Sequence, residues 1–168
     1  MALRQIREIG DPILAKKSKE VKEMTPRIKV LLEDMWETLH DSQGVGLAAV
    51  QVGILKRIFI IEISEDEKYT FINPDIVFTD GEQTDYEGCL SVPGKVGVVT
   101  RPDHVIIEAL DENMEPVRVE GHELLARAMC HEFDHLEGDM YVDLVEGELY
   151  DAENAPALDD DEDEEDNA

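Results

Sequence analysis

The sequence of 168 residues is poor in basic side chains. Fifteen lysines and arginines stand against 41 aspartates and glutamates, so the formal net charge is −26 at pH 7. A surface of that sign repels the phosphates of nucleic acids and the headgroups of anionic lipids. The composition therefore argues against nucleic-acid binding or membrane adsorption as the main activity.

Long apolar runs are absent from the sequence as well. No stretch approaches the roughly 20 apolar residues that a transmembrane helix needs. The first eight residues, MALRQIRE, lack the apolar segment of a secretory signal, so we expect a cytoplasmic protein. Hydrophobic residues still make up 42% of the chain, which is enough for one buried core in a single domain.

Cysteine is scarce too, with Cys89 and Cys130 alone. Two cysteines form at most one bridge, and a reducing cytoplasm would keep both as thiols that are available for packing, metal binding or catalysis. Acidic residues collect at the end of the chain, where 159–166 is an unbroken run of eight acids. We therefore expect one catalytic domain over 1–150 and a disordered acidic tail over 151–168.

Two helices and several short strands are predicted. Thr25 and Pro26 suit an N-cap and first turn, and apolar residues then recur at three-four spacing, which predicts a helix over about 26–40. Strand-like runs follow at 57–63, 70–78, 104–110 and 116–120, the last two joined as a hairpin by 111–115. A second helix is predicted over about 121–137, with Gly138 at its C-cap.

This order of elements predicts an α+β fold, with mostly antiparallel sheets packed around a central metal-binding helix, plus the N-terminal helix. The chemistry lies in that second helix, which carries His131 and His135 four residues apart. Positions i and i+4 differ by about 40° of rotation and one turn of rise, so both imidazoles can reach one cation. Glu132 lies beside them, where it can accept a proton from a metal-activated water.

A catalytic metal usually has three protein ligands, so the third ligand needs a candidate. The third histidine of the extended metzincin pattern would fall at Tyr141, which rules that pattern out. Cys130 lies about 100° around the helix from His131, as expected for a buried thiol. Cys89 in the segment Glu-Gly-Cys-Leu-Ser is the better candidate, and the downstream acids remain as alternatives: Asp139, Asp143 and Glu146.

The other three histidines are not expected to bind this metal. His122 precedes His131 by nine residues, which places it on the opposite face of the predicted helix. His40 and His104 have no partner at metal-ligand spacing in the sequence, so we expect surface or capping groups.

Three segments together resemble the signature motifs of the peptide deformylase family. They are GVGLAAVQ at 44–51, EGCLS at 87–91 and HEFDH at 131–135. They occur in the family's order and at its usual separations, and the similarity extends from about residue 9 to about residue 144. The resemblance implies an enzyme that hydrolyses the N-formyl group of the N-terminal formylmethionine of newly made polypeptides and releases formate.

The resemblance also implies roles for individual residues. Cys89, His131 and His135 would bind one divalent metal, natively Fe²⁺, with Zn²⁺, Ni²⁺ or Co²⁺ able to take its place. Glu132 would be the general acid and base. Gln51 through its side-chain amide and Leu90 through its backbone amide would stabilise the oxyanion that forms at the formyl group.

Further residues are candidates for binding substrate or supporting the site. The backbone of the 44–51 segment, around Gly46, would lie beside an extended peptide, and an apolar pocket would hold the methionine side chain. Its candidate lining residues are Val45, Leu124 and Ala128. Glu87 and Arg101 match family positions that pair to brace the Cys89 loop, although a surface ion pair is the simpler expectation. The spacing leaves the role of Arg127 open.

Two other interpretations stay open at this point. A zinc peptidase would share the helix motif but use a downstream acid in place of Cys89. An acidic interaction module would hold a purely structural metal, which usually has four protein ligands. The expected partners of a deformylase are N-formylmethionyl nascent peptides, near the ribosome. The acidity of the chain makes docking to ribosomal RNA difficult.

Overall fold

The computed structural model describes residues 2–158, so the run of acids at 159–166, expected to form a disordered tail, lies outside the described residues. Its two α-helices are α1 (Pro26–Ser42) and α2 (Glu123–Glu137). The strands are β1 (Gly46–Ala48), β2 (Ile58–Ser64), β3 (Glu67–Asp80), β4 (Gln83–Cys89), β5 (Val92–Arg101), β6 (His104–Leu110), β7 (Pro116–His122) and β8 (Glu146–Asp151). Short 3₁₀ turns are η1 (Pro12–Ala15), η2 (Ala49–Val52) and η3 (Tyr141–Asp143).

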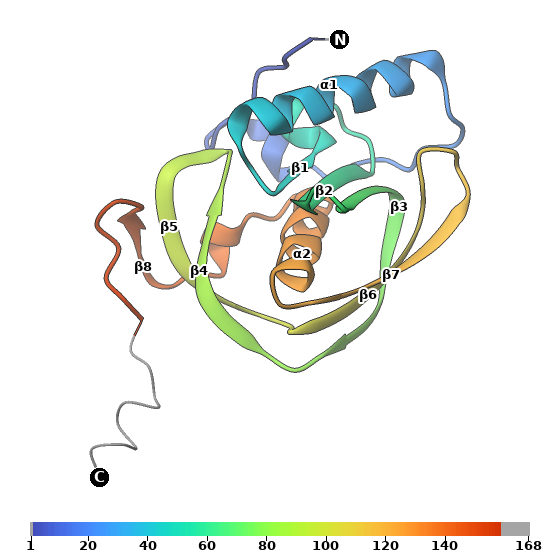
Figure 1. Cartoon of the computed structure of the whole chain (residues 1–168). Coiled ribbons are helices and arrows are strands. Elements are labelled where there is room, and N and C mark those ends of the chain that lie inside the picture. The colour runs from blue at the N-terminus through green and yellow to red at the C-terminus, as the bar shows by residue number, and fades with distance from the viewer. Residues whose placement is uncertain (1, 159–168) are drawn as a thin grey trace.

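Two antiparallel sheets enclose α2. One has five strands in the order β1-β2-β3-β6-β7, and the other has three in the order β4-β5-β8. In Figure 1, α2 stands between the two sheets and α1 lies across the top of the molecule. The predicted α+β fold, with antiparallel sheets around a central helix, is confirmed.

Strand β2 forms the wall between two hydrophobic cores. Phe59 and Ile61 pack in the core that contains α2, whereas Ile58 and Ile60 pack in the core beneath α1. All four side chains are fully buried. Because alternate residues of a strand point to opposite faces, a sheet covered on both sides needs a continuous apolar run, and this run provides it. The sheet thereby holds α1 and α2 in fixed positions.

The predicted first helix is confirmed and extends to Ser42. The Thr25 hydroxyl accepts a hydrogen bond from the Ile28 amide at 3.2 Å, and the helix ends where Gln43 adopts a left-handed conformation with φ 59°. The helix thus continues two residues beyond the predicted end at about residue 40.

The second helix begins two residues later than predicted. Gly121 and His122 continue β7, where they pair with Val105 and His104. A side chain at Gly121 would place its Cβ 2.7 Å from the Met129 sulfur, so glycine permits the close approach of β7 to α2. His122 therefore belongs to a strand, and the prediction that it lies on the opposite face of the helix from His131 is wrong.

Strands β4, β5 and β8 were not predicted, and they position the C-terminal segment. The expected domain boundary at 150 falls within β8. Beyond β8, the Ala152 amide donates a hydrogen bond to the Gly94 carbonyl at 2.9 Å, and the Tyr86 hydroxyl donates one to the Pro156 carbonyl. The chain therefore still contacts the three-stranded sheet after residue 150.

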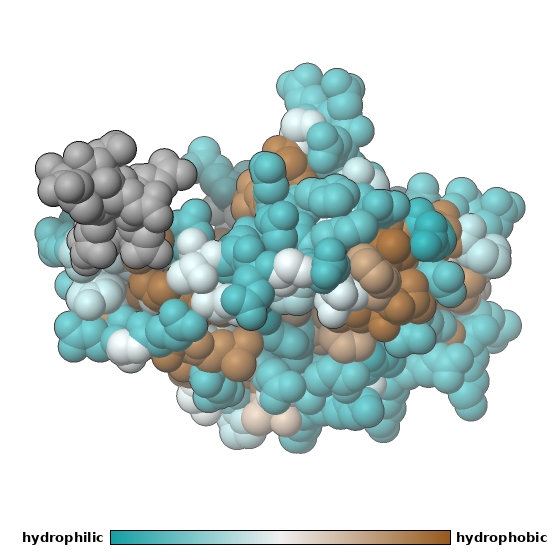
Figure 2. All heavy atoms as spheres, turned by 90° about the horizontal axis from the view of Figure 1, so that it is seen from below, coloured by the Kyte–Doolittle hydropathy of each residue, from teal (hydrophilic) through white to brown (hydrophobic). Residues whose placement is uncertain are grey.

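The face in Figure 2 is mostly hydrophilic, with apolar groups gathered in separate patches. That surface fits the acidic composition of the chain. Within residues 2–158, no helix combines the length and the apolarity that crossing a membrane requires.

Candidate active site

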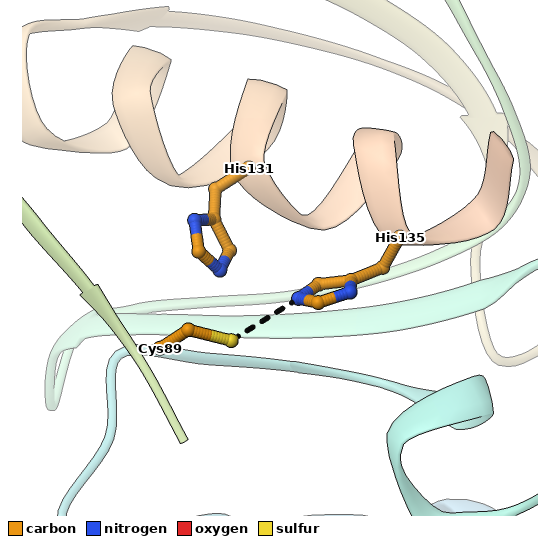
Figure 3. A group of neighbouring side chains, drawn as sticks. All are labelled: Cys89, His131 and His135. Atoms are coloured by element: carbon orange, nitrogen blue, oxygen red, sulfur yellow. Dashed lines mark hydrogen bonds between the residues drawn. The ribbon is translucent and has the colours of Figure 1, made fainter. Parts of the chain in front are cut away.

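Three potential metal ligands converge between α2 and the β4–β5 hairpin. Cys89 ends β4, and His131 and His135 lie one turn apart on α2. Figure 3 shows the three side chains pointing toward one another. The Cys89 Sγ lies 3.4 Å from the His135 Nε2, and one ligand atom from each residue lies within 4.8 Å of the other two. These separations fit three ligands of one cation.

Glu87 connects this cluster to a buried ionic network. Its carboxylate accepts hydrogen bonds from Arg101 at 2.7 and 3.1 Å and from Arg127 at 2.9 Å, and it lies 2.6 Å from the His131 Nδ1. Arg101 also donates to Asp134 at 2.6 Å. The Glu87 and Arg101 side chains are 5% and 4% exposed, so the pair expected by default at the surface is a buried one.

The negative charge of Glu87 fixes the orientation of the His131 ring. Burial alone would raise the pKa of the Glu87 carboxyl, but hydrogen bonds from His131 and Arg101 outweigh burial and hold that pKa well below its usual range. The ionised carboxylate accepts the proton of the His131 Nδ1, so a metal would bind at Nε2 and replace the proton there. Glu87 thereby orients the ring and determines which nitrogen faces the metal.

The surroundings of His135 favour its neutral form. Burial, together with the positive charges of His131 and Arg101, holds the pKa of His135 well below its ordinary value. A neutral imidazole is the form that ligates a cation. Within the described chain the buried His135 Nδ1 has no hydrogen-bond partner, while Nε2 faces Cys89. A thiolate and two neutral imidazoles suit Zn²⁺ and related first-row metals, so these residues fit the metal that the motif predicts.

Glu132 is a buried carboxyl beside these ligands. Burial raises its pKa to about 7. Its Oε2 lies 3.9 Å from the His131 Nε2, and its Oε1 has no hydrogen-bond partner among the described residues. A carboxyl whose pKa lies near neutrality can take up and release a proton under the same conditions. Gly46 packs against it so closely that a Cβ there would lie 2.7 Å from Oε2.

Gln51 points its amide nitrogen at the same cluster. Its Oε1 accepts a hydrogen bond from the Ala48 amide at 2.9 Å, so the NH₂ group faces the opposite way. The Nε2 lies 3.1 Å from the Ser91 Oγ and 3.5 Å from the Cys89 Sγ. The side chain is buried. A fixed donor therefore lies directly beside the candidate metal ligands.

A cavity of about 700 Å³ opens at this cluster. Its volume lies within the range typical of small-molecule sites. Ten of the twelve predicted site residues line it: Val45, Gly46, Gln51, Glu87, Cys89, Leu90, Leu124, Ala128, His131 and Glu132. His135 and Arg101 lie buried outside the lining. Leu124 is half-exposed, while Ala128 is buried.

Several participants were not assigned from the sequence. The sequence left the role of Arg127 open. In the structure it belongs to the ionic network, because it donates hydrogen bonds to Glu87 and to the Gln83 carbonyl. Ser91 and Asp134 were not singled out, although each lies within or beside a motif that was. The buried Cys130 packs in the core around α2, as predicted, and burial raises its pKa to about 11.

A helical HExxH motif between antiparallel sheets, with a cysteine from the neighbouring hairpin, defines a metal-dependent hydrolase. The chain matches the polypeptide deformylase family over residues 3–149. It belongs to that family, whose members are metal-dependent hydrolases acting on N-formyl groups. The alternative of a zinc peptidase, with Asp139, Asp143 or Glu146 as the third ligand, is not supported. The described ligand cluster around these histidines contains Cys89 and none of the three acids.

Individual relatives agree with the family. The peptide deformylase of Lachnoclostridium phytofermentans is 55% identical over 152 residues, which cover 89% of this chain and 93% of that protein. That of Agathobacter rectalis is 56% identical, with 90% and 95% covered. The crystal structure of the Ehrlichia chaffeensis peptide deformylase in complex with actinonin superposes with a TM-score of 0.84 at 36% identity, covering 87% of this chain and 90% of that one.

Proposed function

We propose that this cavity binds the N-terminal formylmethionine of nascent peptides and that Cys89, His131 and His135 hold the metal that hydrolyses the formyl group. The observation that carries the proposal is the convergence of these three ligand atoms beside Glu132, at the wall of a cavity open to substrate. We further propose Fe²⁺ as the native metal, with Zn²⁺, Ni²⁺ or Co²⁺ able to replace it. When bound, the metal would acidify water and polarise the formyl carbonyl.

Glu132 would move the proton in this reaction. In its ionised form it accepts a proton from the attacking water, and it then returns that proton to the nitrogen of the leaving amine. Its pKa of about 7 suits both transfers. Close packing against Gly46 limits the positions that the carboxyl can take.

Gln51 and Leu90 would stabilise the negative charge that grows on the formyl oxygen. The bond from the Ala48 amide orients the Gln51 amide so that its NH₂ faces the ligand cluster. Leu90 follows Cys89 directly and lines the same cavity, which supports its backbone amide as a second donor. Fixed donors of this kind contribute roughly 10²- to 10³-fold to the rate.

The cavity supports an extended peptide with an apolar end. Within residues 2–158, β1 is an edge strand that pairs on one side with β2, and its Gly46 lines the cavity. A substrate lying beside this edge would form main-chain hydrogen bonds, which are indifferent to side chains. Val45, Leu124 and Ala128 would surround the methionine side chain. We place this activity in the cytoplasm, where nascent chains leave the ribosome.

Formate release from a formyl-Met peptide tests the proposal. Protein purified without oxygen and loaded separately with iron, nickel or zinc should release formate, and its metal content should be measured in parallel. Cys89→Ser should lose both metal and activity, whereas Glu132→Ala should keep its metal and lose nearly all turnover. No release with any of the three metals would overturn the function, and an active Glu132→Ala would overturn the role of that residue.

A further inference from the structure

A second cluster of metal-ligating side chains lies at the far end of the five-stranded sheet, outside the cavity. His104, Glu120 and His122 each offer a ligand atom, and the three atoms lie within 4.8 Å of one another. The His104 Nε2 lies 2.8 Å from a Glu120 oxygen, and the His122 Nε2 lies 3.8 Å from the same oxygen. The two imidazole rings stack with centroids 4.1 Å apart.

The β6–β7 hairpin holds these groups in place. His104 and His122 are directly opposed in the antiparallel register, so their side chains point to the same face. Glu120 precedes His122 by two residues and therefore shares that face. Backbone pairing thus brings all three side chains together before any ion binds, although the two stacked rings must turn about their side-chain bonds to direct both Nε2 atoms at one ion. The fixed backbone lowers the conformational entropy that binding would cost.

Charges of both signs surround the cluster: Arg118 shares the face of Glu120 on β7, and acidic residues lie on the other sides. Asp80 of β3 pairs with His104 on its other side and therefore points to the same face. Glu123 follows as the first residue of α2, and its carboxylate adds negative charge where the positive end of the helix dipole would oppose a cation. Phe78 packs edge-on against His104 at 5.1 Å and limits the positions open to that ring.

We propose that His104, Glu120 and His122 form a second metal site, which binds Zn²⁺ through two imidazoles and one carboxylate. Two nitrogens and one oxygen are a common protein ligand set for this ion, with water completing the coordination. The side chains of His122 and Glu120 are 59% and 50% exposed, so the ion enters directly from solvent. This site is independent of the Cys89 cluster and rests on no assumption about the reaction.

A metal bound at this site would stabilise the junction between β7 and α2. It would tie β6 to the last residue of β7, directly before the helix that carries His131. At this junction Glu123 has a φ of 52°, an uncommon conformation for a side chain of its kind, and its amide donates to the Asp103 carbonyl at 3.1 Å. We therefore expect excess Zn²⁺ to raise the melting temperature by a route that requires His122.

Counting bound Zn²⁺ on the full chain tests the proposal. Equilibrium dialysis against buffered Zn²⁺ should give two equivalents for the wild type and one for His122→Gln. Glu120→Gln should weaken the second equivalent at least tenfold, and it provides a second variant if His122→Gln fails to fold. His40→Gln is the matched control, because His40 is an exposed histidine that also contacts a glutamate, and it should keep both equivalents.

Imidazole nitrogen signals in NMR spectra supply a direct readout. The second equivalent of Zn²⁺ should shift the signals of His104 and His122 and leave that of His40 in place. A wild type that binds a single equivalent, which His122→Gln retains, would overturn the proposal. So would a second equivalent that persists with unchanged affinity in both His122→Gln and Glu120→Gln, because that metal would be bound elsewhere on the acidic chain.

Discussion

Replacement of Glu87 by glutamine should damage both metal binding and stability. The carboxylate takes hydrogen bonds from two arginines and lies 2.6 Å from His131, and its side chain is 5% exposed. Glutamine keeps one acceptor oxygen and adds an NH₂ group, which would face the N–H donors of these neighbours. With the NH₂ in place of Oε2, His131 would lose its acceptor, and with the NH₂ in place of Oε1, Arg127 would be left with the Gln83 carbonyl alone.

The magnitude follows from the burial of the network. Breaking a buried ion pair by neutralising one partner costs about 3–5 kcal/mol. In a protein of this size each kcal/mol corresponds to about 2–4 °C, so the melting temperature should fall by roughly 6–20 °C. Loss of the carboxylate that orients a metal-ligating histidine should also weaken metal affinity by about 10- to 100-fold.

Two measurements check this prediction. Thermal denaturation gives the stability, and competition with a chelator, at a temperature where circular dichroism shows the variant to be folded, gives the metal affinity. Glu82→Gln is the matched control, because it removes the same charge from an exposed residue directly before β4. A Glu87→Gln variant that matches this control in both stability and metal affinity would show that the buried network around Glu87 supports neither.

Three further predictions follow from the same structure. Gly46→Ala should lower kcat while metal content stays constant, because a Cβ there would lie 2.7 Å from the Glu132 carboxylate; wild-type kcat would contradict the close packing. Since burial raises the pKa of Glu132 to about 7 and a bound cation lowers it, kcat/KM should decline tenfold per pH unit below an apparent pKa of 7 or less. This acidic limb should be missing from the residual activity of Glu132→Gln, and a persisting limb would assign it to another group. Removal of 159–168 should leave formate release unchanged, whereas removal of 151–168 should reduce it, because Ala152 lines the cavity. If the two truncated proteins are equally active, residues 151–158 are not needed for activity.

Features that depend on local spacing were predictable from the sequence. Helical geometry alone places His131 and His135 on one face, and apolar periodicity alone defines α1. Cys89 comes from a different element, so its proximity to the histidines required elimination and a family resemblance. The family is confirmed, while the roles of the individual residues stay predictions.

Features that depend on pairing between distant segments could not be predicted. Strand β5 carries Pro93, Gly94 and Gly97, which have low strand propensity, and it forms because it pairs with β4 and β8. Arg127 contacts Glu87 across 40 residues of sequence, so the spacing around either residue gives no sign of the other. His104 and His122 were left without a partner for another reason: residues 121–122 were assigned to the helix, whereas the register of the β6–β7 hairpin continues through them.

The proposed metal ligands come from two different parts of the fold, and this division would link the supply of metal to the abundance of the protein. Cys89 and His135 are 46 residues apart and meet when the β4–β5 hairpin has docked on α2, so an unfolded chain presents at most the local histidine pair. Metal would therefore bind the native state selectively, and a concentration of 100 times Kd would add about 2.7 kcal/mol of stability. In cells starved of the metal, the activity of each molecule would fall because its site is empty. The amount of protein would fall as well, because the less stable chain is degraded faster.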